Sequence, residues 1–335
     1  MAKARNFSPW AYWMLRLQSD RATDPCPVED PSALADWRER ARARLRDLLG
    51  PEPERIPLDL EVRDSTDCGT YRRDSIVFDS EAAMSVPAFL LVPHDRQHPG
   101  SAVLAVHGHG PGKSEICGID GEEGGDYAHQ LAELGYVVLA PDLRCFGERA
   151  DWAPPDKYLC DLNLVHAHAA GANPLAQNLW DLARALDVLG EDPLVDPTRI
   201  GVAGFSYGAT MTLFLTATDE RVRAAVVSGY FNAWSAAHEV PWNLCGSQVL
   251  SGMLTAIEHV DLGALAAPRA LLVESGTEDL IFPVDAARTE MARLKSVYDA
   301  FGEADALEHA VFDGGHEWHG GLVEGFLARH LGPAA

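Results

Sequence analysis

Residues 199–216 read RIGVAGFSYGATMTLFLT, and this stretch indicates both the fold class and the chemistry of the chain. Arg199–Ala203 is a short run with branched apolar residues, typical of a buried strand, whereas Tyr207–Thr216 predicts a helix. The turn between them, Gly204-Phe205-Ser206-Tyr207-Gly208, matches the pattern G-x-S-x-G. A serine on such a turn is held in a strained backbone conformation with its hydroxyl above the sheet. We therefore interpret Ser206 as a nucleophile; the alternative is an ordinary serine in a glycine-lined turn.

A base and an acid are needed as well, because a serine hydroxyl is a weak nucleophile at neutral pH. In chains with this motif the expected order is serine, acid, histidine. His316, which follows two glycines after the last predicted strand, is the preferred base, and His319 is the alternative. Asp279, in the loop after the penultimate predicted strand, is the preferred acid, which would hold the imidazole tautomer. The competing carboxylates in that region are Glu274, Glu278 and Asp285.

The chemistry also requires hydrogen-bond donors for the oxyanion that forms when a serine attacks a carbonyl carbon. The backbone N–H of Tyr207, just after the candidate nucleophile, is one expected donor. The backbone N–H of His109, in the loop after the predicted strand Ala102–Val106, is the other. That loop continues as Gly110-Pro111-Gly112-Lys113-Ser114, which partly resembles a phosphate-binding loop. Nucleotide binding is disfavoured, because His107 stands where such a loop needs glycine and no helix is expected directly afterwards.

Two H-x-H pairs, His107/His109 and His166/His168, are the candidates for metal binding. Both pairs lie in predicted loops. Neither pair has a carboxylate or a cysteine at the spacing that metal ligands usually show, and hydrogen bonding within the loops accounts for both pairs. We therefore expect no metal and no cofactor.

Two long insertions, residues 145–171 and 229–267, are expected to form the substrate pocket and to act as lids. Both emerge beyond the carboxyl ends of predicted strands, where ligands bind in open α/β sheets. The candidate substrate-binding side chains are the aromatic residues Trp152, Tyr230, Trp234 and Trp242. A charge network near the mouth of the site is expected from Asp142, Arg144, Glu148 and Arg149.

The wider pattern predicts an α/β fold with a mostly parallel central sheet, an antiparallel start and helices on both faces. Three strand-like runs come first, and strands then alternate with segments whose apolar residues recur at helical spacing. The expected strands are Leu58–Arg63, Tyr71–Phe78, Val86–Val92, Ala102–Val106, Tyr136–Ala140, Arg199–Ala203, Ala224–Ser228, Ala270–Glu274 and Leu307–Phe312. We assign residues 55–335 to this catalytic domain.

Residues 1–54 predict an N-terminal helical extension. An apolar stripe at helical spacing is formed by Trp10, Trp13, Met14 and Leu17. A second helix is expected to begin near Pro31 and to end at Gly50-Pro51. These helices carry no visible chemistry. They either cover the body of the fold or contact a second subunit, which leaves a homo-oligomer open.

The composition of the 335-residue chain excludes several classes of function. Its 27 basic and 50 acidic residues give a formal net charge of −23, so nucleic acids and anionic membranes would repel it. No apolar run approaches the ~18 residues of a membrane span, and the first residues lack the apolar stretch of a signal peptide. The six cysteines are scattered, which is typical of reduced thiols. We therefore expect a cytoplasmic protein whose partner is a small molecule.

Taken together, these motifs resemble those of an α/β-hydrolase, and in particular the dienelactone-hydrolase and acetyl-xylan-esterase-like group. The resemblance is carried by His107-Gly108-His109-Gly110, residues 140–149, residues 199–208, residues 276–283 and Gly314-Gly315-His316. It implies ester hydrolysis and supports Ser206, Asp279 and His316 as a catalytic triad. Dienelactone hydrolases proper use a cysteine nucleophile, so the serine of this chain favours an esterase. Acetyl xylan esterases that act outside the cell usually carry export signals, and none is visible here, which disfavours polymer substrates.

We therefore hypothesise a serine hydrolase that cleaves small carboxylic esters with short, acetyl-type acyl groups through an acyl-enzyme. One alternative is a peptidase or amidase of the prolyl-oligopeptidase-like type. Such proteins usually carry an N-terminal propeller, whereas residues 1–54 of this chain are expected to be helical. The other alternative is a non-catalytic binding protein on a hydrolase scaffold, which would need neither a base nor an acid.

Overall fold

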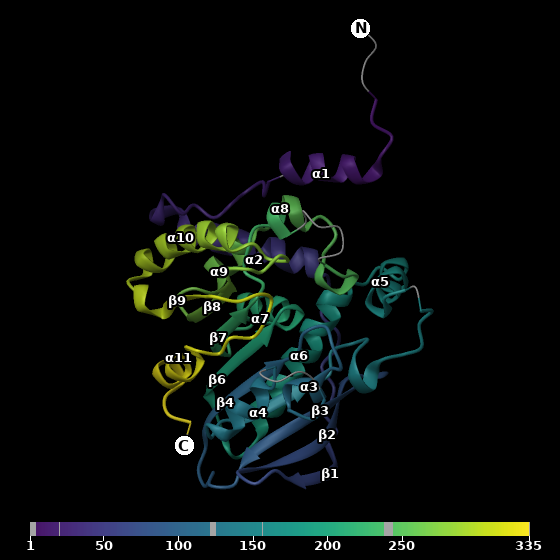
Figure 1. Ribbon diagram of the computed structural model, residues 1–335, viewed down its shortest axis with the longest axis vertical. Helices are drawn as coiled ribbons and strands as arrows, with labels where there is room; N and C mark the ends of the chain where they lie inside the picture. Colours follow the sequence, from purple (N-terminus) through teal and green to yellow (C-terminus); the bar gives the residue numbers. More distant parts are fainter. Residues whose placement is uncertain (1–4, 20, 121–124, 156, 238–243, 335) are drawn as a thin grey trace.

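The computed structural model describes residues 5–19, 21–120, 125–155, 157–237 and 244–334 (Figure 1). Its strands are β1 (Glu61–Asp67), β2 (Tyr71–Glu81), β3 (Met84–Pro93), β4 (Gly100–Val106), β5 (Val137–Pro141), β6 (Val195–Phe205), β7 (Val222–Ser228), β8 (Ala270–Gly276) and β9 (Leu307–Phe312). They form one sheet in the order β1-β2-β3-β5-β4-β6-β7-β8-β9. The pairs from β1 to β5 are antiparallel, and the pairs from β5 to β9 are parallel. The mostly parallel sheet with an antiparallel start is therefore confirmed.

Helices cover both faces of this sheet. The helices of the described residues are α1 (Pro9–Ser19), α2 (Leu34–Leu49), α3 (Lys113–Ile116), α4 (Tyr127–Glu133), α5 (Leu159–Ala169), α6 (Pro174–Glu191), α7 (Tyr207–Thr218), α8 (Trp234–Ala237), α9 (His259–Ala266), α10 (Val284–Phe301) and α11 (Val323–Leu331). Alternate residues of a strand point to opposite faces of the sheet. A Cβ at Gly201 of β6 would lie 2.8 Å from Leu331 of α11, whereas a Cβ at Gly204 would lie 2.7 Å from Thr212 of α7. Helices α11 and α7 therefore pack on opposite sides of β6.

The two N-terminal helices behave differently. Helix α2 buries the apolar face that its sequence predicts, and it ends at Gly50 as expected. Its Arg38 donates to the carbonyl oxygens of Leu265 and Ala267, so α2 is anchored to the end of α9. Helix α1 lies apart from the sheet (Figure 1). It has no buried residue, and Trp13 is 55% exposed. Of the two expected roles, α2 thus covers the body of the fold. In the apolar stripe of α1, Trp10 and Trp13 are exposed, whereas Met14 and Leu17 are half-buried.

The two insertions contain more regular structure than the sequence pattern indicates. Residues 145–171 include the 3₁₀ turn Gly147–Arg149 and helix α5. The expectation that His166 and His168 lie in a loop is therefore wrong. In the second insertion, helix α9 is buried along its whole length, because its apolar residues pack against α7 and α10. That part of the insertion belongs to the core and is not a lid.

No single helix among the described residues is both long and apolar enough to cross a membrane. Two adjoining segments, Gly246–Thr255 and His259–Ala266, pass that test of length and composition only when taken together, with a bend of 96° between them.

Candidate active site

Ser206 occupies a very tight turn between β6 and α7. Its backbone has φ 55° and ψ −116°, a strained conformation for a residue with a side chain. Its N–H donates to the carbonyl oxygen of Ser228 in β7, at 2.9 Å. A Cβ at Gly208 would lie only 1.8 Å from the carbonyl oxygen of Val106 in β4. A Cβ at Gly204 would lie 2.4 Å from the backbone of Gly208, so the close approach of strand and helix requires both glycines.

The structure brings Ser206, His316 and Asp279 into one hydrogen-bonded series. Ser206 Oγ lies 2.9 Å from His316 Nε2, and His316 Nδ1 lies 2.8 Å from Asp279 Oδ2. The other oxygen of Asp279 accepts hydrogen bonds from the backbone N–H groups of Ile281 and Phe282, at 2.8 and 2.9 Å. The Asp279 side chain is 1% exposed and the His316 side chain 20%. The carboxylate is thus fixed by its own loop, and the imidazole bridges it to a hydroxyl that faces a more open region.

The alternative residues for base and acid take other roles. The ring of His319 stacks on Phe312 with a centroid distance of 4.4 Å and an interplanar angle of 5°. His319 lies in the irregular segment before α11. Glu274 is buried in β8 and accepts a hydrogen bond from the N–H of Gly320. Neither side chain forms a hydrogen bond with the Ser206 hydroxyl among those of the described residues.

The loop after β4 runs along the turn that carries Ser206. A Cβ at Gly108 would lie 3.1 Å from the carbonyl oxygen of Phe205 and 3.5 Å from Ser206 Cβ. The next residue, His109, places its ring 5.0 Å from the ring of Tyr207. Tyr207 begins α7, and the first N–H groups of a helix have no acceptor within the helix. The two residues expected to donate to an oxyanion therefore both lie next to Ser206.

His107 holds this loop in place through two hydrogen bonds. It is fully buried, its Nε2 accepts the N–H of Leu143 at 2.9 Å, and its Nδ1 donates to the carbonyl oxygen of Gly108 at 2.7 Å. An Nε2 that accepts a hydrogen bond carries no proton, so the imidazole is neutral and its proton is on Nδ1. Burial lowers the pKa of His107 from its ordinary 6.5 to about 4. The histidine is therefore a neutral structural pin for the loop that carries His109.

The predicted charge network is present and includes Asp142, Arg144, Glu148 and Arg149. Its centre is the buried Lys113, whose Nζ lies 2.5 Å from oxygens of both Asp142 and Glu148. Arg144 and Arg149 both pair with Asp181 of α6. The expectation that no helix follows the phosphate-loop-like stretch is wrong, because α3 begins at Lys113. Its lysine nevertheless belongs to this network, since two carboxylates already bind it.

The predicted pocket residues are placed unequally. Trp152 is 82% exposed, whereas Tyr230 and Trp234 are buried. The indole N–H of Trp234 donates to the carbonyl oxygen of Ile257 at 2.6 Å, which is the position of a core residue. Trp242 lies outside the described residues.

Two aromatic residues that the sequence analysis did not select flank the imidazole of His316. The ring of Phe205 lies 4.7 Å from that imidazole, and the ring of Phe282 lies 5.7 Å from it. Tyr230 is one layer further away, 5.5 Å from Phe282. A signal existed in both cases, since Phe205 is the residue before the candidate nucleophile and Phe282 follows Asp279 in the acid loop.

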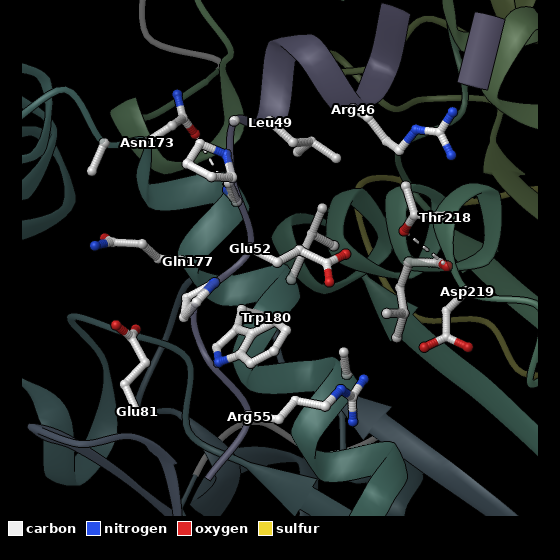
Figure 2. Close-up of a pocket in the computed structure, with 18 of the residues that line it drawn as sticks. Arg46, Leu49, Glu52, Arg55, Glu81, Asn173, Gln177, Trp180, Thr218 and Asp219 are labelled. Atoms are coloured by element: carbon white, nitrogen blue, oxygen red, sulfur yellow. Dashed lines mark hydrogen bonds between the residues drawn. The ribbon is translucent and has the colours of Figure 1, made fainter. Parts of the chain in front are cut away.

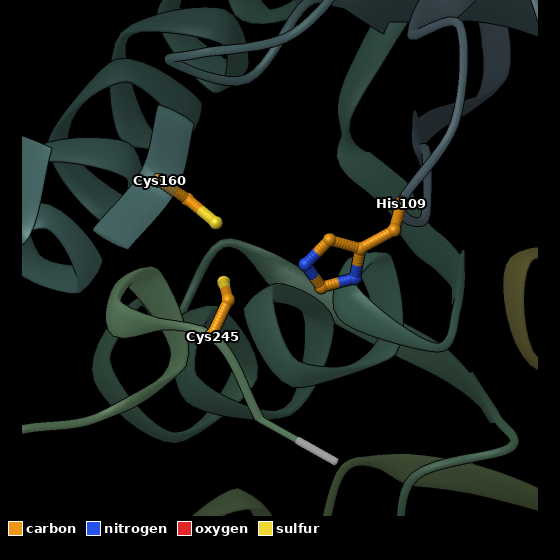
Figure 3. A group of neighbouring side chains, drawn as sticks. All are labelled: His109, Cys160 and Cys245. Carbon is orange, nitrogen blue, oxygen red and sulfur yellow. The ribbon is translucent and has the colours of Figure 1, made fainter. Parts of the chain in front are cut away.

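A histidine and two cysteines also meet beside the site, although the sequence analysis predicts no metal ligands. His109, Cys160 and Cys245 place their ligand atoms within 4.8 Å of one another (Figure 3). The pKa of the Cys160 thiol is lowered below its ordinary range, because the Cys245 thiol donates a hydrogen bond to it. A hydrogen bond with His109 lowers this pKa further. No spacing rule reveals this group, because its members come from three separate segments.

A cavity of about 650 Å³ lies elsewhere, between the end of α2, the segment that follows it, and helices α6 and α7 (Figure 2). Trp180 and Arg55 form part of its wall, with the guanidinium 5.4 Å from the indole ring centroid. Neither Ser206, His316 nor Asp279 lines it. The cavity is therefore separate from the hydrogen-bonded series.

Comparisons with known proteins agree with this geometry. Residues 87–244 match the dienelactone hydrolase family. YtaP of Bacillus subtilis, named as a proposed hydrolase, is 27% identical over 303 residues, which cover 83% of this chain and 94% of that protein. A proposed acetyl xylan esterase from Bacteroides fragilis superposes with a TM-score of 0.78 at 17% identity, covering 92% of this chain and 83% of that one. A glucuronoyl esterase from Solibacter usitatus superposes with a TM-score of 0.66 at 17% identity, covering 90% of this chain and 92% of that one.

Proposed function

Because residues 87–244 match the dienelactone hydrolase family and the chain has an α/β-hydrolase fold, we propose that it is a serine-dependent carboxylic ester hydrolase acting on small, short-acyl esters. One observation carries the proposal. The hydroxyl of Ser206, on a strained turn, lies 2.9 Å from an imidazole that is itself 2.8 Å from a buried carboxylate. This is the geometry by which a histidine activates a serine and a carboxylate orients the histidine.

In the first half of the proposed reaction, His316 Nε2 accepts the proton of Ser206 as Oγ attacks the ester carbonyl carbon. Asp279 holds the imidazole through Nδ1–H and stabilises the imidazolium that forms. The tetrahedral intermediate then collapses, His316 gives its proton to the alkoxy oxygen, and the alcohol leaves. What remains is an acyl group on Ser206.

The negative charge on the carbonyl oxygen is met by backbone donors. The N–H of Tyr207 points from the start of α7, where the helix dipole favours negative charge. The N–H of His109 comes from the loop that runs along the turn. One such donor typically lowers the barrier by ~3 kcal/mol.

In the second half, the same imidazole removes a proton from water as the water attacks the acyl carbon. The new tetrahedral intermediate collapses to the free carboxylic acid and returns the proton to Ser206. The reaction therefore consumes one water and regenerates the enzyme, and its proton transfers are all made at His316.

Two observations support a short acyl group. The rings of Phe205 and Phe282 both pack close to the imidazole, with centroid distances of 4.7 and 5.7 Å, and two such rings limit the space beside the reacting carbonyl. One of the similar structures is that of a proposed acetyl xylan esterase, an enzyme named for esters with a short acyl group. Among the acyl groups of carboxylic esters, only the formyl group is shorter than acetyl.

The test is a series of initial rates on p-nitrophenyl acetate, butyrate and octanoate. The proposal expects turnover that is fastest on acetate and that falls at least about 10⁴-fold in Ser206→Ala. Ser251→Ala, at an exposed serine, is the matched control and should keep the wild-type rate. Equal rates in Ser206→Ala and wild type would refute the proposal. Faster turnover of aminoacyl anilides than of esters would replace it with an amidase.

A further inference from the structure

An imidazole and two thiols from separate segments meet beside the turn that carries Ser206 (Figure 3). His109 follows β4, Cys160 lies on α5, and Cys245 precedes the 3₁₀ turn Gly246–Gln248. One ligand atom from each lies within 4.8 Å of the other two. We propose that His109, Cys160 and Cys245 form a binding site for Zn²⁺.

The donor set selects the metal. Zn²⁺ is bound by thiolate sulfur and imidazole nitrogen in tetrahedral geometry, and a site with three protein ligands leaves the fourth position to water. With metal–ligand bonds of about 2.0–2.3 Å, tetrahedral ligand atoms stand roughly 3.5–3.8 Å apart. Side chains already within 4.8 Å need to move by only about an ångström. Magnesium and calcium prefer oxygen ligands and are not expected here.

The two cysteines are held together by contacts that do not involve a metal. Asp161, the residue after Cys160, accepts the N–H of Gly246 at 2.7 Å. A Cβ at Gly246 would lie 2.6 Å from Cβ of Leu164 and 3.2 Å from the carbonyl oxygen of Cys160. The segment that carries Cys245 therefore lies directly against α5. Contacts of the backbone therefore bring the two thiols close together, and zinc binding does not require the two segments to move toward each other.

The imidazole of His109 is held by neighbouring aromatic rings and is also exposed to solvent. The ring of His109 lies 5.4 Å from the ring of Phe146 and 5.0 Å from that of Tyr207, which limit its orientation. His109 is exposed, while Cys245 is half-buried and Cys160 is buried. A cation can therefore enter from the histidine side and reach the thiols behind it, which is the entry path that a metal site needs.

The location gives the site its significance. His109 follows Gly108, whose Cα lies against the Ser206 turn. A zinc ion held at these side chains would join both insertions to the loop after β4. This inference does not depend on ester hydrolysis, because it concerns binding by side chains that the proposed reaction does not use.

The experiment measures zinc binding to the full chain, reduced and freed of metal with a chelator. Zn²⁺ is titrated in competition with a chromophoric chelator, and wild type is expected to bind one equivalent. Cys160→Ser and Cys245→Ser should each lose at least about 100-fold in affinity, since changing a residue that only hydrogen-bonds to a metal ligand already costs about 10–100-fold. Cys68→Ser, at a half-buried cysteine in the turn between β1 and β2, is the control and should bind as wild type does.

Two further readouts keep the proposal falsifiable. Co²⁺ in place of Zn²⁺ should give a thiolate-to-cobalt charge-transfer band in wild type and Cys68→Ser that weakens in the other two variants. Zn²⁺ should raise the melting temperature of wild type and of Cys68→Ser by mass action, and should raise that of Cys160→Ser and Cys245→Ser much less. If Cys160→Ser does not fold, Cys245→Ser carries the test, because its side chain is less buried. Equal zinc affinity in all four proteins, or cobalt binding without the thiolate band, would overturn the proposal.

Discussion

The turn at residues 204–208 and the insertion at residues 145–171 are held in place by different kinds of contact. In the turn, the backbone of Gly208 touches the backbone of β4, and the N–H of Ser206 is bonded to β7. In the insertion, Trp152 is 82% exposed and Tyr158 is 72% exposed. Helix α5 is tied down chiefly through its contact with the segment around Gly246.

The difference indicates which part of the fold fixes the position of the nucleophile and which part can vary to bind different substrates. The backbone of Gly208 in α7 lies so close to β4 and to Gly204 that neither glycine has room for a Cβ, so the position of Ser206 is determined by the packing of α7 on the sheet. The insertion rests on a few side chains, and loops of this kind are where binding residues usually vary. Substitutions should therefore have effects that decline from the hydrogen-bonded series outward to the insertion.

The largest effect is expected from Asp279→Asn. An amide offers its N–H to the imidazole in place of an oxygen and so stabilises the wrong tautomer, and in a serine protease this change lowers kcat ≈ 10⁴-fold. We expect a loss of about that size in p-nitrophenyl acetate turnover. The control is Asp285→Asn, whose carboxylate is exposed at the start of α10. A loss below about tenfold would show that Asp279 does not orient His316.

The next effect concerns folding. In Gly208→Ala the new methyl group would lie 1.8 Å from the carbonyl oxygen of Val106, and backbone atoms must move to make room. We expect the free energy of unfolding to fall by about 1–3 kcal/mol or more in urea denaturation. Gly190→Ala in α6 has open space around it and should instead gain up to about 1 kcal/mol. If both variants had the same stability, the turn would not be set by backbone contact.

The third effect is a dependence of stability on pH. Because the pKa of His107 is about 4 in the folded chain and 6.5 ordinarily, the unfolded chain binds more protons between these values. The free energy of unfolding should therefore fall as the pH is lowered from 6.5 to 4, with His107 contributing about 3 kcal/mol. His107→Gln should show a shallower slope in this window, whereas exposed His98→Gln should keep the wild-type slope. Identical slopes in all three proteins would contradict a buried neutral His107.

The smallest effect is expected from Trp152→Ala in the insertion. With the side chain 82% exposed, the free energy of unfolding should change by less than about 0.5 kcal/mol. The kcat on p-nitrophenyl acetate should stay within about twofold of wild type, with any change confined to KM, since only ground-state binding is lost. A substantial fall in kcat would place the insertion within the catalytic machinery and remove the contrast with the turn.

Much of the sheet could be predicted from the sequence, because buried parallel strands are continuous apolar runs. Residues 102–106 and 224–228 are examples, and each lies within an observed strand. Strand β1 is the exception. It was expected at Leu58–Arg63 but spans Glu61–Asp67, where every residue is exposed. An edge strand of this kind is defined by pairing with β2 and leaves no apolar alternation to detect.

Some residues of the candidate site could likewise be predicted from the sequence, and others could not. The predictions for Ser206, Asp279 and His316 rest on motifs whose place at strand ends follows from the fold. The convergence of Cys160 and Cys245 depends on how two insertions pack against each other, and no periodicity records it. The burial of Trp234 in the core and the exposure of Trp152 could not be distinguished for the same reason. Aromatic composition alone does not reveal which side of an insertion faces the sheet.

The proposed activation of Ser206 can be measured by reacting the protein with a fluorophosphonate and locating the adduct by intact mass and peptide mapping. We expect one adduct per chain, on the peptide that contains Ser206, and no adduct in Ser206→Ala. An unlabelled wild type, or an adduct that persists in Ser206→Ala, would contradict the proposed activation.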